Sequence, residues 1–302
     1  MDYRSLGKNG PRVSRMGLGC NRIGQDHEDD AHWIDLLEAA RSAGVTLLDT
    51  SEVYADTHSE RLIGNVLGSD PAVVIASKIR AFEPRHLERE TALRALEGSL
   101  RRLRRERLDV LQLHSPGRAA LAETDWPELL AGLQQRGLIR LRGVAIDTTE
   151  DAVRLLKTCP DAFDLLQVTY HLGDRSAEAE LFPLAQQHGI ALLGRMPLAR
   201  GIFTGKFTQA EEITESFRGH LMKERTAAYL DVAHRLEPIA AAYPGGITRL
   251  AHHFAMAPAA IAATIPGAKN RAQLSANLTA ADGPGDDWPA WRERIAQVLD
   301  AD

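Results

Sequence analysis

Four side chains suited to acid–base chemistry occur at or just after apolar runs of this 302-residue sequence. Asp49, Lys78 and His114 stand at the ends of three such runs, and Tyr54 follows shortly after Asp49. An ammonium beside a phenol stabilises the phenolate, so we expect Lys78, paired with Asp49, to lower the Tyr54 pKa. Two unit charges about 4 Å apart interact by roughly 4 kcal/mol at an effective dielectric near 20. This interaction is large enough to make Tyr54 a general acid near neutral pH.

An imidazole next to that phenol adds a second function. His114 would orient and polarise a carbonyl oxygen at the point where Tyr54 delivers its proton. These groups do not supply electrons, so a reduction needs a nicotinamide as hydride source. Taken singly, each residue has a structural alternative. Asp49 is also typical of a helix cap or a structural ion pair, Tyr54 of packing, and His114 of a hydrogen-bonded core. The four together favour catalysis.

The elements that must position these side chains alternate between short strands and longer amphipathic helices. Eight apolar runs are typical of buried parallel strands. They span residues 13–19, 46–50, 72–78, 109–114, 140–146, 164–170, 190–195 and 259–267. Two helical stripes between them are Trp33, Leu36, Leu37, Ala40 and Leu93, Leu96, Leu100, Leu103. The pattern predicts one α/β domain over residues 1–302, a (β/α)8 TIM barrel whose active site lies at the carboxyl ends of its strands.

Two segments interrupt this alternation. Residues 1–12 carry Lys8-Asn9-Gly10-Pro11 between short runs, which predicts a β-hairpin ahead of the barrel. The gap from Arg200 to about Gly219 is too long for a plain connection between the seventh strand and its helix. Because strand ends form the active-site face, this loop is expected to lie over the site.

Composition and charge narrow the class of protein. A formal net charge of −5 argues against a nucleic-acid binder, which needs a basic face. The arginines of residues 101–107 alternate with leucines and indicate a solvated helix face. Two cysteines without metal-binding spacing suit a reducing compartment. With no signal peptide or membrane-length apolar run in the sequence, we expect a cytoplasmic protein with a small-molecule partner.

A metal-dependent barrel hydrolase is the rival interpretation of the same fold. Such an enzyme needs paired histidines on an early strand, whereas the first predicted strand runs into Gly19-Cys20-Asn21. His252 and His253 adjoin in a helical run, where successive side chains point apart. The sequence therefore predicts no metal site.

The sequence resembles the aldo-keto reductase superfamily over nearly its whole length. The similarity runs from YRSLGKNGPRVSRMGLGC to IPGAKNRAQLSANL, through GVTLLDTSEVYADTHSERLIG, ASKI, RLDVLQLHSP and PLARGIFTGKF in the family's order. The resemblance implies that Asp49, Tyr54, Lys78 and His114 form a catalytic tetrad. It implies reduction of an aldehyde or ketone to an alcohol by NADPH, with Tyr54 protonating the oxygen as hydride arrives from C4 of the nicotinamide.

The same resemblance implies a set of cofactor contacts. Gln167 matches a residue that binds the nicotinamide carboxamide, and Leu198 and Lys206 lie in a loop that folds over the pyrophosphate. Arg218 corresponds to an arginine at the adenosine end, and the last unit contributes three residues near the adenine and 2′-phosphate, which are Lys269, Gln273 and Asn277. NADP(H) is the expected cofactor. NAD(H) is the alternative, because many members have Lys-Ser where this chain has Gly267-Ala268.

Two departures from the family pattern concern the nicotinamide. Many relatives have Ser-Asn after the fifth strand, where this chain has Ala145-Ile146-Asp147. Many also place an aromatic residue and a serine before Pro-Leu at the seventh strand, where this chain has Arg195 and Met196. The Arg195 guanidinium either lies against the nicotinamide or the cofactor phosphates, or turns aside to cap backbone carbonyls. The alternative function is an NADPH-binding regulatory or auxiliary subunit with little turnover, since some relatives act chiefly as partners of other proteins.

Overall fold

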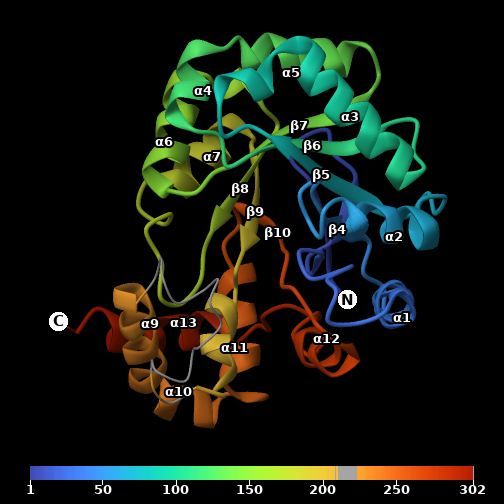
Figure 1. Ribbon diagram of the computed structural model, residues 1–302. Helices are drawn as coiled ribbons and strands as arrows, with labels where there is room; N and C mark the ends of the chain where they lie inside the picture. Colours follow the sequence, from blue (N-terminus) through green and yellow to red (C-terminus); the bar gives the residue numbers. More distant parts are fainter. Residues whose placement is uncertain (208, 210–222, 302) are drawn as a thin grey trace.

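A curved sheet of parallel strands forms the centre of the computed structural model, which describes residues 1–207, 209 and 223–301, and helices surround it (Figure 1). Neighbouring strands of this sheet are consecutive along the chain. The strands are β3 (Leu18–Gly19), β4 (Leu47–Asp49), β5 (Val74–Arg80), β6 (Leu108–His114), β7 (Ile139–Ala145), β8 (Leu165–Thr169), β9 (Ala191–Arg195) and β10 (Ile261–Thr264). Sequential parallel order requires a crossover between each pair of strands, and helices supply it.

The first and last strands meet and close the sheet. Gly17 N donates to Thr264 O at 2.8 Å, and Gly19 N donates to Pro266 O at 2.9 Å. Parallel bridges join Met16 to Thr264 and Gly19 to Gly267. A Cβ at Gly19 would lie only 2.7 Å from the carbonyl oxygen of Ile265, so this seam requires glycine. The predicted barrel is confirmed.

The helices cover the outside of the barrel, and their boundaries follow local sequence. Asp29 caps the first helix by accepting a hydrogen bond from His32 N, and the predicted Trp33-to-Ala40 stripe is buried. The helices are α1 (Asp30–Ser42), α2 (His58–Leu67), α3 (Arg89–Leu103), α4 (Arg118–Glu123), α5 (Trp126–Gln135), α6 (Thr149–Thr158), α7 (Leu181–His188), α9 (Lys223–Arg235), α10 (Glu237–Ala242), α11 (Gly246–Met256), α12 (Arg271–Leu278) and α13 (Trp288–Leu299). Short 3-10 turns are η1 (Pro84–Leu87), η2 (Pro160–Ala162) and η3 (Ala199–Thr204).

A two-stranded antiparallel hairpin precedes the barrel, as expected. Its strands are β1 (Tyr3–Ser5) and β2 (Arg12–Ser14). The hairpin takes part of the predicted first strand, residues 13–19, of which only Leu18–Gly19 joins the barrel. Leu6 and Val13 are buried in one cluster with residues at the starts of the barrel strands, such as Leu47. The hairpin therefore covers the amino end of the barrel, and the opposite end, formed by the carboxyl ends of the strands, is here called the open end.

Part of the arginine-rich segment is structural rather than solvated. Arg102 Nε donates to Glu60 Oε2 at 2.7 Å, and Glu60 is fully buried on α2. Ser77 Oγ donates to the other carboxylate oxygen at 2.5 Å. Arg105 donates to the carbonyl oxygen of Asp70 at 2.8 Å. These contacts join α2, α3 and β5, so the expected solvated face holds for Arg101, Arg104 and Arg107 but not for Arg102 and Arg105.

No helix within residues 1–207 and 223–301 is long and apolar enough to cross a membrane. The same described residues contain no cluster of three or more His, Cys, Asp or Glu side chains placed to hold a metal ion. His252 and His253 are both buried on α11 and bind different partners, Asn277 and Tyr243.

Two helical glycines give a matched test of the packing. A Cβ on Gly64 of α2 would overlap the carbonyl oxygen of Arg102, whereas a Cβ on Gly132 of α5 would meet nothing within 4 Å. We expect Gly64→Ala to lower the free energy of unfolding by about 1–3 kcal/mol, because the helices must move apart. Gly132→Ala should raise it by about 0.5–1 kcal/mol through helix propensity alone. Urea unfolding measures both, and equal effects would contradict the close packing of α2 on α3.

Candidate active site

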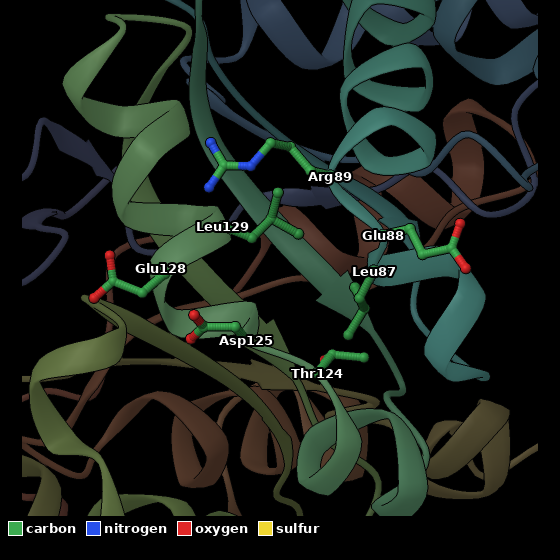
Figure 2. Close-up of a pocket in the computed structure, with 7 residues that line it drawn as sticks. All are labelled: Leu87, Glu88, Arg89, Thr124, Asp125, Glu128 and Leu129. Carbon is green, nitrogen blue, oxygen red and sulfur yellow. The ribbon is translucent and has the colours of Figure 1, made fainter.

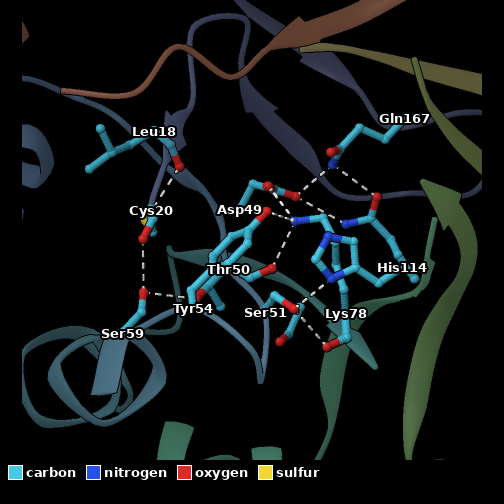
Figure 3. A network of polar contacts seen from close by, with 12 residues as sticks. Leu18, Cys20, Asp49, Thr50, Ser51, Tyr54, Ser59, Lys78, His114 and Gln167 are labelled. Atoms are coloured by element: carbon cyan, nitrogen blue, oxygen red, sulfur yellow. Dashed lines mark hydrogen bonds and ion pairs between the residues drawn. The ribbon is translucent and has the colours of Figure 1, made fainter. Parts of the chain in front are cut away.

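The four residues Asp49, Tyr54, Lys78 and His114, here called the tetrad, lie together at the open end of the barrel (Figure 3). Asp49 ends β4, Lys78 lies near the end of β5, and His114 ends β6. Tyr54 comes from the loop between β4 and α2. Because the strands are parallel and adjacent, their carboxyl ends bring these side chains to one place. The predicted convergence of the tetrad is present in the structure.

Lys78 is the centre of the contacts. Its Nζ donates to Asp49 Oδ2 at 2.6 Å, to the carbonyl oxygen of Thr50 at 2.8 Å and to the Tyr54 hydroxyl oxygen at 3.3 Å. Lys78 is 1% exposed. Burial acts to lower the pKa of Lys78, but the nearby Asp49 and Tyr54 outweigh it and hold that pKa above its ordinary value. The side chain is therefore an ammonium at neutral pH.

Asp49 is held by two further donors. Gln112 Nε2 donates to Asp49 Oδ1 at 3.0 Å, and Gln167 Nε2 donates to the same oxygen at 2.7 Å. Gln167 also donates to Gln112 Oε1 at 3.0 Å. Sequence reasoning missed Gln112, although a polar residue inside the apolar run DVLQLH was a signal. Gln167, expected at the nicotinamide carboxamide, here orients a tetrad carboxylate, and its contact with a cofactor stays a prediction.

His114 is oriented by a hydroxyl that the sequence analysis did not single out. Ser51 Oγ lies 3.0 Å from His114 Nδ1, and the imidazole meets the Tyr54 ring edge-on with 5.7 Å between centroids. Burial, with a contribution from the charge of Lys78, lowers the pKa of His114 to about 4. His114 is therefore a neutral imidazole at physiological pH.

The Tyr54 hydroxyl differs from expectation. Burial raises the pKa of Tyr54 above its ordinary value, and the opposing charge of Lys78 does not overcome it. The prediction of a lowered Tyr54 pKa was therefore wrong. The free energy lost when the phenolate is removed from water exceeds the stabilisation that the Lys78 ammonium provides. Tyr54 remains a protonated phenol at neutral pH, which is the state that a proton donor requires.

Backbone strain is concentrated at the open end of the barrel. Eight non-glycine residues in the described part of the chain have positive φ, and only Arg104, at the end of α3, lies away from this end. The others follow β4, β6 or β9 and are Ala55, Asp56, Thr57, Ser115, Met196, Ala199 and Arg200. Left-handed backbone costs non-glycine residues free energy and persists where the surroundings enforce it, commonly at functional sites.

The two departures from the family pattern contact each other. An Arg195 guanidinium nitrogen lies 2.8 Å from Asp147 Oδ1 and donates to the carbonyl oxygen of Ile146 at 3.2 Å. Arg195 Nε donates to Thr169 Oγ1 at 3.2 Å, and Ser115 Oγ donates to Asp147 at 2.9 Å. The hydrogen bond from Arg195 to the Ile146 carbonyl oxygen is the contact expected if Arg195 turns aside to cap backbone carbonyls. A contact of Arg195 with a cofactor stays a prediction.

The other expected cofactor residues lie in two regions. Leu198 packs partly buried at the start of η3, and Lys206 Nζ lies 4.4 Å from the Phe207 ring centroid. Lys269 N donates to Gln273 Oε1 at 2.9 Å at the start of α12.

Asn277 has both ends of its side chain engaged. Its Oδ1 lies 3.1 Å from His252 Nε2, and its Nδ2 donates to Gly267 O at 3.2 Å. Asn277 therefore holds the turn after β10, which contains Lys269. Arg218 lies outside the described residues.

A hollow on the outside of the barrel is separate from the tetrad. It lies between the amino ends of α3 and α5 and is lined by Arg89, Asp125 and Glu128 among others (Figure 2). It contains none of the residues singled out in the sequence. The side chains suited to catalysis therefore lie at the open end of the barrel and not in this hollow.

Comparison with known proteins identifies the family of this chain over nearly its whole length. A profile of the Aldo/keto reductase family matches residues 15–293. The chain is 29% identical to "Aldo-keto reductase YhdN" of Bacillus subtilis, covering 91% of this chain and 87% of that protein. It is 26% identical to "Probable voltage-gated potassium channel subunit beta" of Oryza sativa subsp. japonica, covering 93% and 92%.

Solved structures share the fold. An aldo-keto reductase from Klebsiella pneumoniae in complex with NADPH superposes with a TM-score of 0.74 at 25% identity, covering 99% of this chain and 95% of that one. The holo form of an aldo-keto reductase from Bacillus halodurans gives a TM-score of 0.80 at 24% identity, covering 99% and 96%.

The buried ion pair can be tested through stability. Asp49→Asn and Lys78→Met should each lower the free energy of unfolding by about 3–5 kcal/mol, because each leaves the partner charge buried and uncompensated. The double variant Asp49→Asn/Lys78→Met should be more stable than the sum of the two single losses predicts. A double-mutant cycle in urea measures the coupling. Strictly additive losses would show that the two charges do not compensate each other.

Proposed function

Because the chain belongs to the aldo/keto reductase family, we propose that it is an NADPH-dependent oxidoreductase that reduces an aldehyde or ketone to an alcohol. The observation that supports this most directly is the position of Lys78 Nζ, which contacts both the Asp49 carboxylate and the Tyr54 hydroxyl in a buried site. Such an arrangement stabilises charge that appears on the phenol during proton transfer. A structural ion pair alone would not require the phenol.

The open end of the barrel suits an anionic dinucleotide. Burial and the positive charges of Arg195 and Arg22 lower the pKa of Arg200, which follows β9 in η3. Arginine side chains at the carboxyl ends of the strands favour binding of phosphate groups. When bound there, NADPH would supply the hydride. The side chains proposed to hold it are Gln167, Arg195, Leu198, Lys206, Arg218, Lys269, Gln273 and Asn277.

Tyr54 is the proposed general acid. In the reduction, hydride forms a C–H bond at the carbonyl carbon, the π electron pair moves to oxygen, and that oxygen takes a proton. The incipient alkoxide is a much stronger base than phenolate, so a phenol with a raised pKa still donates readily. Lys78 stabilises the phenolate that remains, and Asp49 keeps Lys78 charged and in place.

His114 is proposed to orient the carbonyl oxygen. The single hydroxyl hydrogen of Ser51 has two acceptors within reach, the Lys78 carbonyl oxygen at 3.2 Å and His114 Nδ1 at 3.0 Å. The proposed role of His114 requires donation to Nδ1, which leaves the proton on Nε2, where it can be donated to the substrate. Because the pKa of His114 is about 4, this neutral form dominates at physiological pH. Its hydrogen bond would strengthen as charge develops on the oxygen.

A regulatory or auxiliary subunit is the second candidate. It is favoured by the full-length similarity to a protein named as a potassium channel β subunit. The two candidates differ in turnover, since a regulatory subunit binds NADPH but oxidises little of it. Following NADPH absorbance with propanal, benzaldehyde and glyceraldehyde discriminates between them. Tight NADPH binding without turnover of any of the three would favour the regulatory role.

The role of Tyr54 predicts a specific loss. Tyr54→Phe should reduce kcat at least about a hundredfold, because general acid catalysis typically contributes about 10² to 10⁴. The NADPH dissociation constant should hardly change, since the variant removes a single hydroxyl. Steady-state kinetics and fluorescence titration measure the two quantities. Near-normal turnover by the variant would mean that another group donates the proton.

The proposed cofactor contacts predict an effect on cofactor affinity that is independent of the loss of turnover expected for Tyr54→Phe. We expect NADPH to bind more tightly than NADH, with Lys269 and Arg218 pairing with the 2′-phosphate. Lys269→Ala should weaken NADPH binding at least about fivefold and leave NADH binding unchanged. Arg271→Ala is the matched control, because Arg271 begins α12 two residues after Lys269 and its guanidinium pairs with Asp35 of α1 at 2.5 Å. Equal affinities of the wild-type protein for the two cofactors would refute this assignment.

A further inference from the structure

Phe82 is the large hydrophobic side chain that stands out as exposed in the described part of the chain, at 47%. It follows β5 and begins the loop that leads to η1. Its ring lies 5.8 Å from the His114 ring, centroid to centroid, at an interplanar angle of 49°. His114 in turn meets the Tyr54 ring at 5.7 Å. Three rings thus run in sequence from the protein surface to the Tyr54 hydroxyl.

A single exposed apolar side chain is ordinary on a protein surface and by itself indicates nothing. The position of Phe82 is what distinguishes it. Ala81, the residue before it, is buried, whereas the Phe82 ring is about half exposed. The ring lies between His86, at 6.2 Å between centroids, and the imidazole of His114. A bound molecule that covers this exposed aromatic ring would remove apolar surface from water, which favours binding.

The loop that carries Phe82 is fixed by local contacts. Gly117 N donates to the Ala81 carbonyl oxygen at 3.3 Å, and a Cβ on Gly117 would lie 2.5 Å from the Phe82 carbonyl oxygen. Immediately after Phe82, Glu83 and His86 form a capping box at the start of η1, with Glu83 N donating to His86 Nδ1 at 3.1 Å. The ring is therefore presented on an anchored backbone, which lowers the entropic cost of using it to bind.

We propose that Phe82 is a specificity-determining residue that packs against the apolar, planar group next to the carbonyl of an aryl aldehyde or aryl ketone substrate. This inference rests on the proposed carbonyl reduction. With the carbonyl oxygen at Tyr54 and His114, the substituent of the substrate extends along the His114 ring and reaches Phe82. A short aliphatic aldehyde reacts at the same place without reaching Phe82.

The test compares two aldehydes in the NADPH-loaded protein. Phe82→Ala should raise KM for benzaldehyde about three- to tenfold, the range expected for loss of one aromatic contact. The KM for propanal and the kcat for both aldehydes should change less than about twofold. Phe82→Trp should keep the low KM for benzaldehyde, and Phe82→Leu should fall between. The melting temperature should hardly change in any variant, because the ring is half exposed.

Two results would overturn the proposal. An equal rise in KM for both aldehydes, or a fall in kcat for both, would mean that Phe82 acts only by holding His114 in place. Should the wild-type protein reduce neither aldehyde, the proposed function fails, and binding of benzamide to the NADP⁺-loaded protein still tests Phe82. Calorimetry showing tighter binding of benzamide to wild type than to Phe82→Ala supports the contact. Equal binding of benzamide to both refutes it.

Discussion

The ion pair between Lys78 and Asp49 is the interaction on which the site depends. Both charges are buried, and two buried charges are tolerated only when each compensates the other and the remaining hydrogen-bonding capacity is used. That condition extends the network to Gln112, Gln167 and the Thr50 carbonyl. The network crosses from β4 to β8, so the ion pair needs the closed barrel around it. The fold and the candidate chemistry therefore share one set of contacts.

The state of Tyr54 shows how burial and charge compete. A positive charge at hydrogen-bond distance favours phenolate, whereas the surrounding protein removes the water that would stabilise it. Burial dominates in this structure, and the pKa rises. Tyr54 is protonated in the resting site, and the Lys78 ammonium lies beside it. The site therefore stabilises the negative charge that appears on the phenol oxygen during proton transfer, rather than a phenolate in the resting state. The neutral His114 fits the same arrangement, since another cation there would compete with Lys78.

The contact between Arg195 and Asp147 links two substitutions that lie far apart in sequence. Each one alone would place an unusual charge beside the nicotinamide site implied by the family. Together they form a partly exposed ion pair that also satisfies a backbone carbonyl and is reinforced by Ser115. The pair sits between β7 and β9 and restrains both strand ends. Charge at this position is therefore balanced by a neighbour on the same end of the barrel.

The sequence by itself determined the barrel, the hairpin and the four residues of the tetrad. Strand and helix periodicity are local properties, and parallel strands must present their carboxyl ends together, so Asp49, Lys78 and His114 converge without further information. The seam between β3 and β10, the donors from Gln112 and Ser51, and the raised pKa of Tyr54 were decided only by the tertiary structure. These features depend on which side chains become neighbours across the barrel and on how much water is excluded between them, and neither quantity is encoded in the spacing of residues along the chain.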